Sequence, residues 1–355
     1  GSPLVLCHTE EGSVAASDMV ALLRYSRDYF VLPENQIAVL NADGIEMTAP
    51  DGTSVHPQIL SVTWDLSSAR KNGFKHYMLK EIHEQPDALR RTVAPRLLKI
   101  SVTNEAGRPD AYLPDLTADG IPDLIFSRMN RVVIAACGTA MHAGLIGRIL
   151  LERLLRIPVS VEIASEFRYQ DPILDEQTLV ITVSQSGETA DTIAALRLSR
   201  ERRAVTLSVV NVKGSSIARE SDYALACEGS IKLKEITYIH SEAYAAGELK
   251  HGTLSLITEG VPVIALGTQL NVLSKLISNI KEVRARGAMV ILITKQEAII
   301  EECLYDDRID LPDCPDLFAP FGAAVILQLL AYNTSACRGL DVDQPRNLAK
   351  SVTVE

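Results

Sequence analysis

In the second half of the sequence, short apolar runs alternate with segments in which apolar residues recur at helical spacing. The apolar runs are typical of strands buried on both faces, and the segments between them are typical of covering helices. Strands are predicted at residues 131–137, 158–164, 178–184 and 204–212, and helices at 142–155, 165–169 and 188–201. This order predicts a parallel sheet with helices on both faces.

The same alternation returns nearer the C-terminus. Strands are predicted at residues 261–266 and 288–294, and helices at 270–286 and 317–337. The sequence therefore predicts two α/β units in tandem.

The first 65 residues have a different pattern, with short β-rich runs separated by turn residues. Strands are predicted at residues 3–8, 29–33, 36–40, 44–49 and 59–64, and one helix at 16–26, capped by Ser17 or Asp18. This antiparallel α+β piece is small for an independent domain. Residues 66–128 carry more charge, and we interpret them as a linker with an entry helix at 76–97, interrupted at Pro86 and Pro95.

Composition narrows the range of functions. The chain has 355 residues, 47% of them hydrophobic, and a net charge of −10. No Lys/Arg run is present, so we expect no nucleic-acid partner. The six cysteines are scattered without metal-binding spacing, so we expect neither a metal nor a cofactor, and reduced thiols in the cytoplasm. No uncharged apolar stretch is long enough for a membrane span, so no membrane partner is expected.

The turn SQSGET, residues 184–189, joins a predicted strand to a predicted helix. Ligands of parallel sheets bind at this end of the strands. Ser184, Ser186 and Thr189 offer hydroxyl groups, Gly187 allows close approach of the backbone, and the helix start offers free N–H groups. The turn therefore predicts a phosphate site without lysine. The alternative is that these hydroxyls only cap the helix.

A second turn of this kind is CGTAMHAG, residues 137–144. Gly138 and Thr139 could form another rim of the same pocket. A tight turn with a capping threonine explains this segment equally well.

Other titratable residues gather in residues 232–252 and in the C-terminal tail, 341–355. Lys232 and Glu235 are three residues apart, on one helix face, where they could transfer protons or form a surface ion pair. His251 lies in a loop, and most such histidines are not catalytic. Lys350 lies among small and apolar residues, where it could form a Schiff base or be an exposed lysine of the tail.

Taken together, these segments resemble one family over nearly the whole chain. The resemblance rests on CGTxxHAG, ASEFRY, SQSGETADT, VNVxGSSIARESD, HYMLKEIHEQP, EGSxKLKEITYIHSEAYAAGELKHG and DVDQPRNLAKSVTVE. They are similar to segments of the glutamine:fructose-6-phosphate aminotransferases, the glucosamine-6-phosphate synthase family. This resemblance implies tandem flavodoxin-like sugar-isomerase (SIS) units after a glutaminase domain of the N-terminal-nucleophile type. It also implies a homodimer that converts fructose 6-phosphate and glutamine-derived ammonia into glucosamine 6-phosphate, the first step towards UDP-N-acetylglucosamine.

The resemblance also assigns roles to residues. Ser184, Gln185, Ser186 and Thr189 would hold the sugar phosphate, with Thr139 in the other substrate-side turn. The resemblance implies four catalytic residues: Lys350 for the imine with the ketose, Glu235 for proton transfer between C1 and C2, Lys232 beside it, and His251 for ring opening from the neighbouring subunit.

Three departures from the family pattern matter. Residues 1–70 resemble only the last part of the glutaminase domain, without its N-terminal Cys-Gly-Ile, so we expect no glutaminase activity. A long segment is missing near residues 226 and 227, because residues 131–226 fall short of the roughly 130–150 residues expected for a flavodoxin-like unit. Ala140 replaces a serine typical of the family.

These departures define the predicted domain boundaries. The predicted parts are a glutaminase-type remnant at 1–70, linker and entry helices at 71–128, a truncated first SIS unit at 129–226, a second SIS unit without its first strand at 227–340, and an active-site tail at 341–355. Two alternatives to an active synthase remain: a non-catalytic SIS-type module that binds sugar phosphates, and an inactive truncated form.

Overall fold

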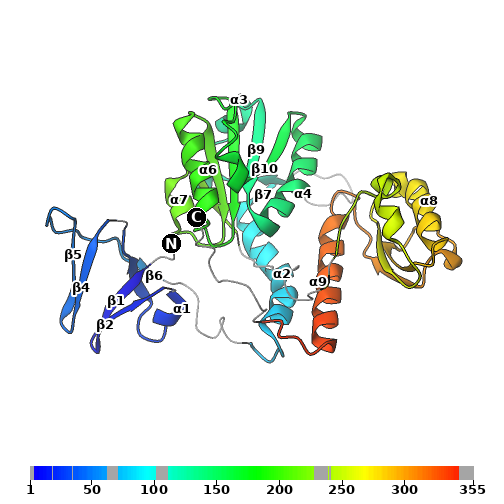
Figure 1. Cartoon of the computed structure of the whole chain (residues 1–355). Coiled ribbons are helices and arrows are strands. Elements are labelled where there is room, and N and C mark those ends of the chain that lie inside the picture. The colour runs from blue at the N-terminus through cyan, green and yellow to red at the C-terminus, as the bar shows by residue number, and fades with distance from the viewer. Residues whose placement is uncertain are drawn as a thin grey trace. The chain divides into compact units, whose positions relative to one another are not determined.

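The structure is a computed structural model that describes residues 4–17, 19–33, 35–61, 71–100, 111–227, 239 and 241–343 (Figure 1). The chain divides into two compact units. The first contains described residues 4–227 and the second contains described residues 239–343. Within the described residues, no helix combines the length and the hydrophobicity needed to span a bilayer.

The N-terminal region is an antiparallel β structure, as predicted, although its second strand was not predicted and its helix is shorter than the predicted 16–26. Its main sheet has the order β2-β1-β3-β6, and β4 and β5 form a separate hairpin. The elements are β1 (Val5–Thr9), β2 (Gly12–Ala16), α1 (Met19–Leu22), β3 (Asp28–Val31), β4 (Ile37–Asn41), β5 (Gly44–Thr48) and β6 (Leu60–Ser61). Val5, Cys7 and Leu22 form its buried core.

The entry helix differs from the prediction in one respect. Helix α2 (Tyr77–Val93) passes through Pro86 without a break. Proline lacks the N–H that would bond to the carbonyl oxygen of Ile82. The side-chain amide of Gln85 instead donates to that oxygen at 3.0 Å, which compensates for the lost backbone bond. Pro95 does end the helix, in the 3₁₀ segment η1 (Ala94–Arg96).

The region between α2 and the first parallel sheet also contains a hairpin that the sequence analysis did not predict. It pairs β7 (Leu97–Ile100) with β8 (Ala111–Pro114). The segments η2 (Thr117–Asp119) and α3 (Leu124–Arg128) follow. Ile121 and Ile125 from this region are buried against the parallel sheet.

The first parallel sheet has five strands in the order β10-β9-β11-β12-β13. In chain order this is 2-1-3-4-5, the flavodoxin-like arrangement. Its elements are β9 (Arg131–Ala136), α4 (Gly138–Leu155), β10 (Val159–Ile163), α5 (Ala164–Phe167), β11 (Thr178–Ser184), α6 (Ala190–Glu201), β12 (Val205–Val210), α7 (Ser216–Glu220) and β13 (Tyr223–Ala226). The short strand β13 was not predicted, and it completes the sheet in fewer residues than expected.

Helices cover both faces of this sheet (Figure 1). Phe167 of α5 and Ala195 of α6 pack on one face. The other face is covered by α3 and α4. Gly144 brings α4 close to β9, because a Cβ at this position would lie 2.9 Å from Ile134. The predicted α/β class is therefore confirmed for this unit.

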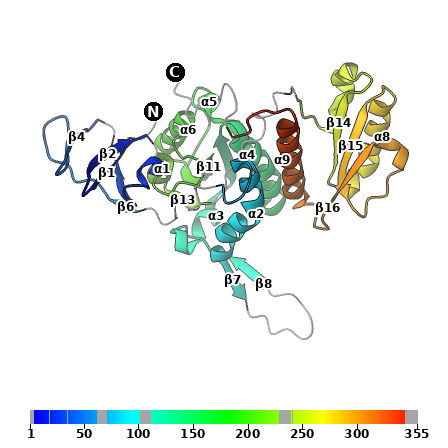
Figure 2. The same cartoon turned by 90° about the horizontal axis from the view of Figure 1, so that it is seen from below.

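The second unit contains a smaller parallel sheet in the order β14-β15-β16 (Figure 2). Its strands and α-helices are β14 (Pro262–Gly267), α8 (Leu273–Arg284), β15 (Met289–Lys295), β16 (Asp307–Leu311) and α9 (Ala319–Cys337). Its 3₁₀ segments are η3 (Ala246–His251), η4 (Thr253–Leu256), η5 (Leu270–Val272) and η6 (Glu302–Leu304). Helix α8 packs on the face that carries Val290 and Leu292, and α9 packs on the face that carries Ile293 and Leu311.

The two sheets share a hydrogen-bonding device. In the first sheet, Asp222 accepts the N–H of Thr206 at 2.9 Å, which joins the start of β12 to the start of β13. In the second sheet, Asp306 accepts the N–H of Val290 at 2.6 Å and joins β15 to β16 in the same way. We therefore equate β14, β15 and β16 with β11, β12 and β13, so that β14 is an edge strand of the described sheet where β11 is internal.

Candidate functional site

The turn after β11 gathers hydroxyl groups at the edge of the first sheet. The Ser184 and Thr189 hydroxyl oxygens are 3.1 Å apart, and Ser184 Oγ accepts the N–H of Gly187 at 3.0 Å. Thr189 is the N-cap residue of α6, yet its side chain makes no capping hydrogen bond to that helix in the described structure. Helix capping alone therefore does not account for the hydroxyl of Thr189.

The start of α6 adds backbone donors to this turn. The first intrahelical bond runs from the N–H of Ile193 to the carbonyl oxygen of Thr189 at 2.9 Å. The N–H groups of the three residues before Ile193 have no acceptor within a helix that begins here. These groups form the positive end of the helix dipole, which favours an anion. Gln185 and Ser186 are exposed, so that an anion in solvent can reach the turn.

Gly187 gives the turn its shape. Its φ of +67° lies in the left-handed region, and a Cβ there would be 2.0 Å from the hydroxyl of Ser215. Only glycine fits this backbone conformation and this contact. The glycine that the sequence analysis assigned to close backbone approach is therefore also a packing requirement between two connections of the sheet.

The second predicted turn lies beside the first. The register pairs Ala136 of β9 with Val183 of β11, so the two turns leave adjacent parallel strands at the same edge. Adjacent strands are about 4.8 Å apart. Thr139 is exposed in the first turn of α4, and Gly138 has a φ of +57°. The structure thus places Thr139 at the same sheet edge as the SQSGET turn.

Comparisons with known proteins agree with this architecture. Residues 125–229 and 221–336 each match the SIS domain family. The chain is 41% identical to the glutamine–fructose-6-phosphate aminotransferase [isomerizing] of Symbiobacterium thermophilum, in an alignment over 447 residues that covers 100% of this chain and 71% of that relative. The chain belongs to the glutamine–fructose-6-phosphate aminotransferase family.

Two further matches support this assignment. The enzyme of Clostridium acetobutylicum is 38% identical, over 100% of this chain and 71% of that relative. Among solved structures, the C-terminal domain of the Francisella tularensis glucosamine-fructose-6-phosphate aminotransferase superposes with a TM-score of 0.67 at 29% identity. That match covers 78% of this chain and 100% of the solved chain.

The alignments also show that members of the aminotransferase family have segments that this chain lacks. The alignment to the Symbiobacterium protein extends over 447 residues, whereas the chain has 355. The two SIS matches overlap at residues 221–229, where the sequence analysis expects a missing segment. The predicted domain boundaries themselves stay a prediction.

Of the other residues expected from the aminotransferase family, only His251 lies in the described part of the chain. His251 is the last residue of η3, in the second unit, and its side chain is exposed. Lys232, Glu235 and Lys350 lie outside the described residues. The described site therefore consists of the two turns of the first sheet. In the described part of the chain, no group of three or more His, Cys, Asp or Glu residues could hold a metal ion.

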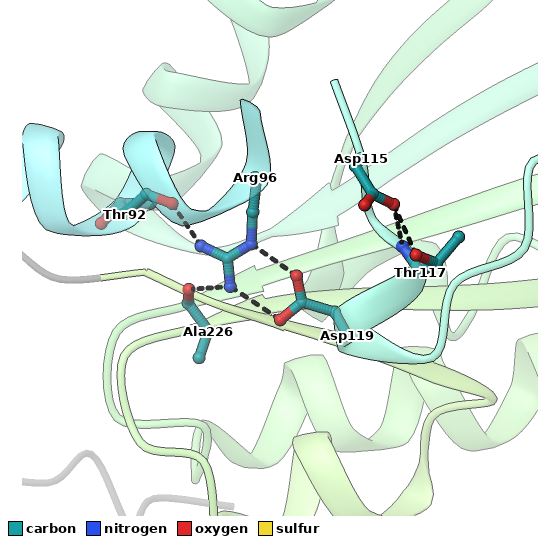
Figure 3. Close-up of polar contacts among 6 residues, drawn as sticks. All are labelled: Thr92, Arg96, Asp115, Thr117, Asp119 and Ala226. Carbon is teal, nitrogen blue, oxygen red and sulfur yellow. Dashed lines mark hydrogen bonds and ion pairs between the residues drawn. The ribbon is translucent and has the colours of Figure 1, made fainter. Parts of the chain in front are cut away.

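A partly buried ion pair near the end of β13 was not predicted from the sequence (Figure 3). Arg96 donates to both carboxylate oxygens of Asp119, at 2.6 and 2.8 Å. Its guanidinium also donates to the carbonyl oxygens of Ala226, at 2.9 Å, and of Thr92. This hydrogen bonding holds the pKa of Asp119 below its usual value and raises the pKa of Arg96. Because the paired residues are 23 positions apart, no local sequence pattern indicates the pair.

Asp115 lies beside the pair of Arg96 and Asp119, and the sequence does indicate its hydrogen bonds. Its carboxylate accepts the hydroxyl of Thr117 at 2.5 Å and the N–H of Thr117 at 2.9 Å. These bonds lower the pKa of Asp115 (Figure 3). An Asp two residues before a Thr is typical of such a local turn, so the start of η2 could have been predicted.

Proposed function

We propose that the chain binds the phosphate group of fructose 6-phosphate at the SQSGET turn and converts the sugar, with ammonia, into glucosamine 6-phosphate. The observation that carries this proposal is the grouping of hydroxyls at the start of α6. The names of the relatives supply the substrate class, because they are fructose-6-phosphate aminotransferases.

The phosphate would be held by hydroxyl and N–H donors. Ser184, Ser186 and Thr189 supply hydroxyls, Gln185 an amide, and Thr139 a further hydroxyl from the neighbouring turn. In the described structure, Ser184 and Thr189 bond to each other at 3.1 Å. A phosphate oxygen would take over these donors, and charge-assisted hydrogen bonds are shorter and stronger than the neutral ones they replace.

The chemistry requires residues beyond the turn. Overall, the C2 oxygen of the open-chain ketose leaves as water, nitrogen from ammonia takes its place, and a proton moves from C1 to C2. In this proposal Lys350 forms the imine at C2 with loss of water, and ammonia then displaces the lysine amine from C2. Glu235 moves the proton with Lys232 nearby. His251 assists ring opening from the second subunit of a homodimer. Ammonia is the nitrogen donor in this proposal.

The first test is a thermal-shift titration with glucosamine 6-phosphate, with glucosamine as the control. A ligand that binds only the folded state stabilises it by about 2.7 kcal/mol at 100 times its Kd. We expect glucosamine 6-phosphate to raise the unfolding temperature and glucosamine to leave it unchanged. An ammonia-dependent assay with fructose 6-phosphate and a Lys350→Ala variant then tests turnover. If neither sugar shifts the transition, the phosphate site is refuted.

A second candidate is a non-catalytic module that binds sugar phosphates. The shorter length of the chain relative to its alignments favours it. The two candidates differ in the ammonia assay. A module binds glucosamine 6-phosphate without turnover, and a Lys350→Ala substitution leaves its behaviour unchanged.

A further inference from the structure

The SQSGET turn is attached at three points to the segment that runs from the end of β12 into the start of α7. The N–H of Asn211 donates to the carbonyl oxygen of Gln185 at 3.2 Å, and the N–H of Ile217 donates to that of Gly187 at 3.1 Å. The third bond is the only one of these three that uses a side chain. It runs from the N–H of Ser216 to Oε1 of Glu188, at 2.8 Å.

Glu188 raises an electrostatic question. It lies between Gly187 and Thr189, in a turn proposed to bind a phosphate dianion, and like charges repel. Its carboxylate is engaged elsewhere, because it accepts the N–H of Ser216, the first residue of α7. Its own N–H donates to the hydroxyl of Ser186 at 3.2 Å. Glu188 therefore joins one of the proposed phosphate ligands to a fixed neighbouring element.

We propose that Glu188 is a positioning residue for the phosphate site. Its carboxylate ties the turn to the start of α7 and thereby fixes the orientation of Ser186 and Thr189. This inference rests on the proposed function, and it adds a residue that does not itself touch the phosphate.

The direction in which Glu188→Ala changes phosphate binding distinguishes a positioning role from a purely electrostatic one. If Glu188 acted only as a nearby negative charge, its removal would tighten phosphate binding. If it holds the turn, Glu188→Ala weakens binding although a repulsive charge is lost. Glu188→Gln keeps an oxygen that can accept the N–H of Ser216 and removes the charge, so it restores binding.

The same bond can be broken from its other end. Ser216→Pro removes the donor, and proline suits the first position of a helix. The preceding residue, Ser215, has φ −69° and ψ 161°, which a following proline allows. The control is Glu176→Ala, which removes an exposed glutamate whose ion pair does not involve the SQSGET turn.

The experiment is a calorimetric titration of glucosamine 6-phosphate into the full chain and these variants, with the unfolding temperature of each recorded without ligand. We expect Glu188→Ala and Ser216→Pro each to raise Kd about five- to tenfold, the net value of one typical hydrogen bond. The double variant should be no weaker than either single one. Glu188→Gln and Glu176→Ala should stay within about twofold of the unmodified chain.

The outcomes are distinct. If Glu188→Ala binds as tightly as the unmodified chain or more tightly, the positioning role is refuted, even if its unfolding temperature falls. If Glu188→Gln binds as weakly as Glu188→Ala, charge and not the hydrogen bond is responsible, and the inference is also refuted. If the unmodified chain binds no glucosamine 6-phosphate, the proposed function itself fails, and this inference fails with it.

Discussion

Arg96 provides the sharpest prediction about stability. The side chains of Arg96 and Asp119 are 14% and 19% exposed, so the pair is largely withdrawn from water. Arg96→Ala leaves the carboxylate of Asp119 and the carbonyl oxygen of Ala226 without their donor. Removing one partner of a fully buried pair costs about 3–5 kcal/mol. Because water can still reach part of this pair, we expect a loss of about 2–3 kcal/mol in the free energy of unfolding.

Scanning calorimetry is the assay. The chain has two compact units, and only the transition of the unit that contains Arg96 should shift, by roughly 4–12 °C. Amide hydrogen exchange gives a local readout, because the N–H of Cys227 bonds to the carbonyl oxygen of Val210 at 2.8 Å, next to the Ala226 contact. Exchange at Cys227 should accelerate in Arg96→Ala.

Two further variants make this test decisive. Arg90→Ala removes an exposed ion pair of the preceding helix α2, with Asp87, and should change stability by less than about 0.5 kcal/mol. In a double-mutant cycle with Asp119→Ala, we expect a coupling energy of about 1–3 kcal/mol. If Arg96→Ala shifts the transition no more than Arg90→Ala, the role assigned to the pair of Arg96 and Asp119 is wrong.

Three other predictions concern single groups. Gly187→Ala should abolish the thermal shift with glucosamine 6-phosphate, because its Cβ would lie 2.0 Å from a serine hydroxyl; a retained shift would contradict the geometry of the turn. The hydrogen bond from Arg96 lowers the pKa of Asp119, so its stabilisation is complete above the ordinary aspartate pKa of about 3.9 and is lost as pH falls through the lower folded value. Acid titration by circular dichroism should therefore show a smaller stability loss in Arg96→Ala than in the unmodified chain. Burial raises the pKa of Cys227 whereas Cys303 is exposed, so iodoacetamide should modify Cys303 about tenfold faster, as mass spectrometry can follow.

Much of the fold followed from patterns of hydrophobicity. The long apolar strands of the first sheet and the helices between them were predicted close to their observed positions, because strands buried on both faces leave a strong local signal. The shorter strands β13 and β16 were missed. Each is edge-placed and only partly buried, so its sequence carries little apolar excess. Pro86 was misread as a helix break because the compensating bond from Gln85 depends on three-dimensional geometry.

The candidate site also has a part that the sequence predicts and a part that it does not. Ser184, Gly187 and Thr189 could be predicted because a strand, a polar turn and a helix follow one another in the sequence. The role of Glu188 could not, since its partner Ser216 is 28 residues away and the bond uses a backbone N–H that every non-proline residue has. Local chemistry is visible in a sequence, whereas the contacts that hold it in place are not.

The edge strand β14 has a consequence for the behaviour of the protein in solution. Met289 donates its N–H to the carbonyl oxygen of Val261, so by alternation Pro262, Ile264 and Leu266 turn their backbone groups to the open side of the described sheet. Proline has no N–H, so an added strand would find no donor at Pro262 and fewer positions with which to pair. Two donors and two side chains that are each 43% exposed remain at Ile264 and Leu266. Within the described sheet, Ile264 and Leu266 are therefore the positions at which a further strand could add to this edge.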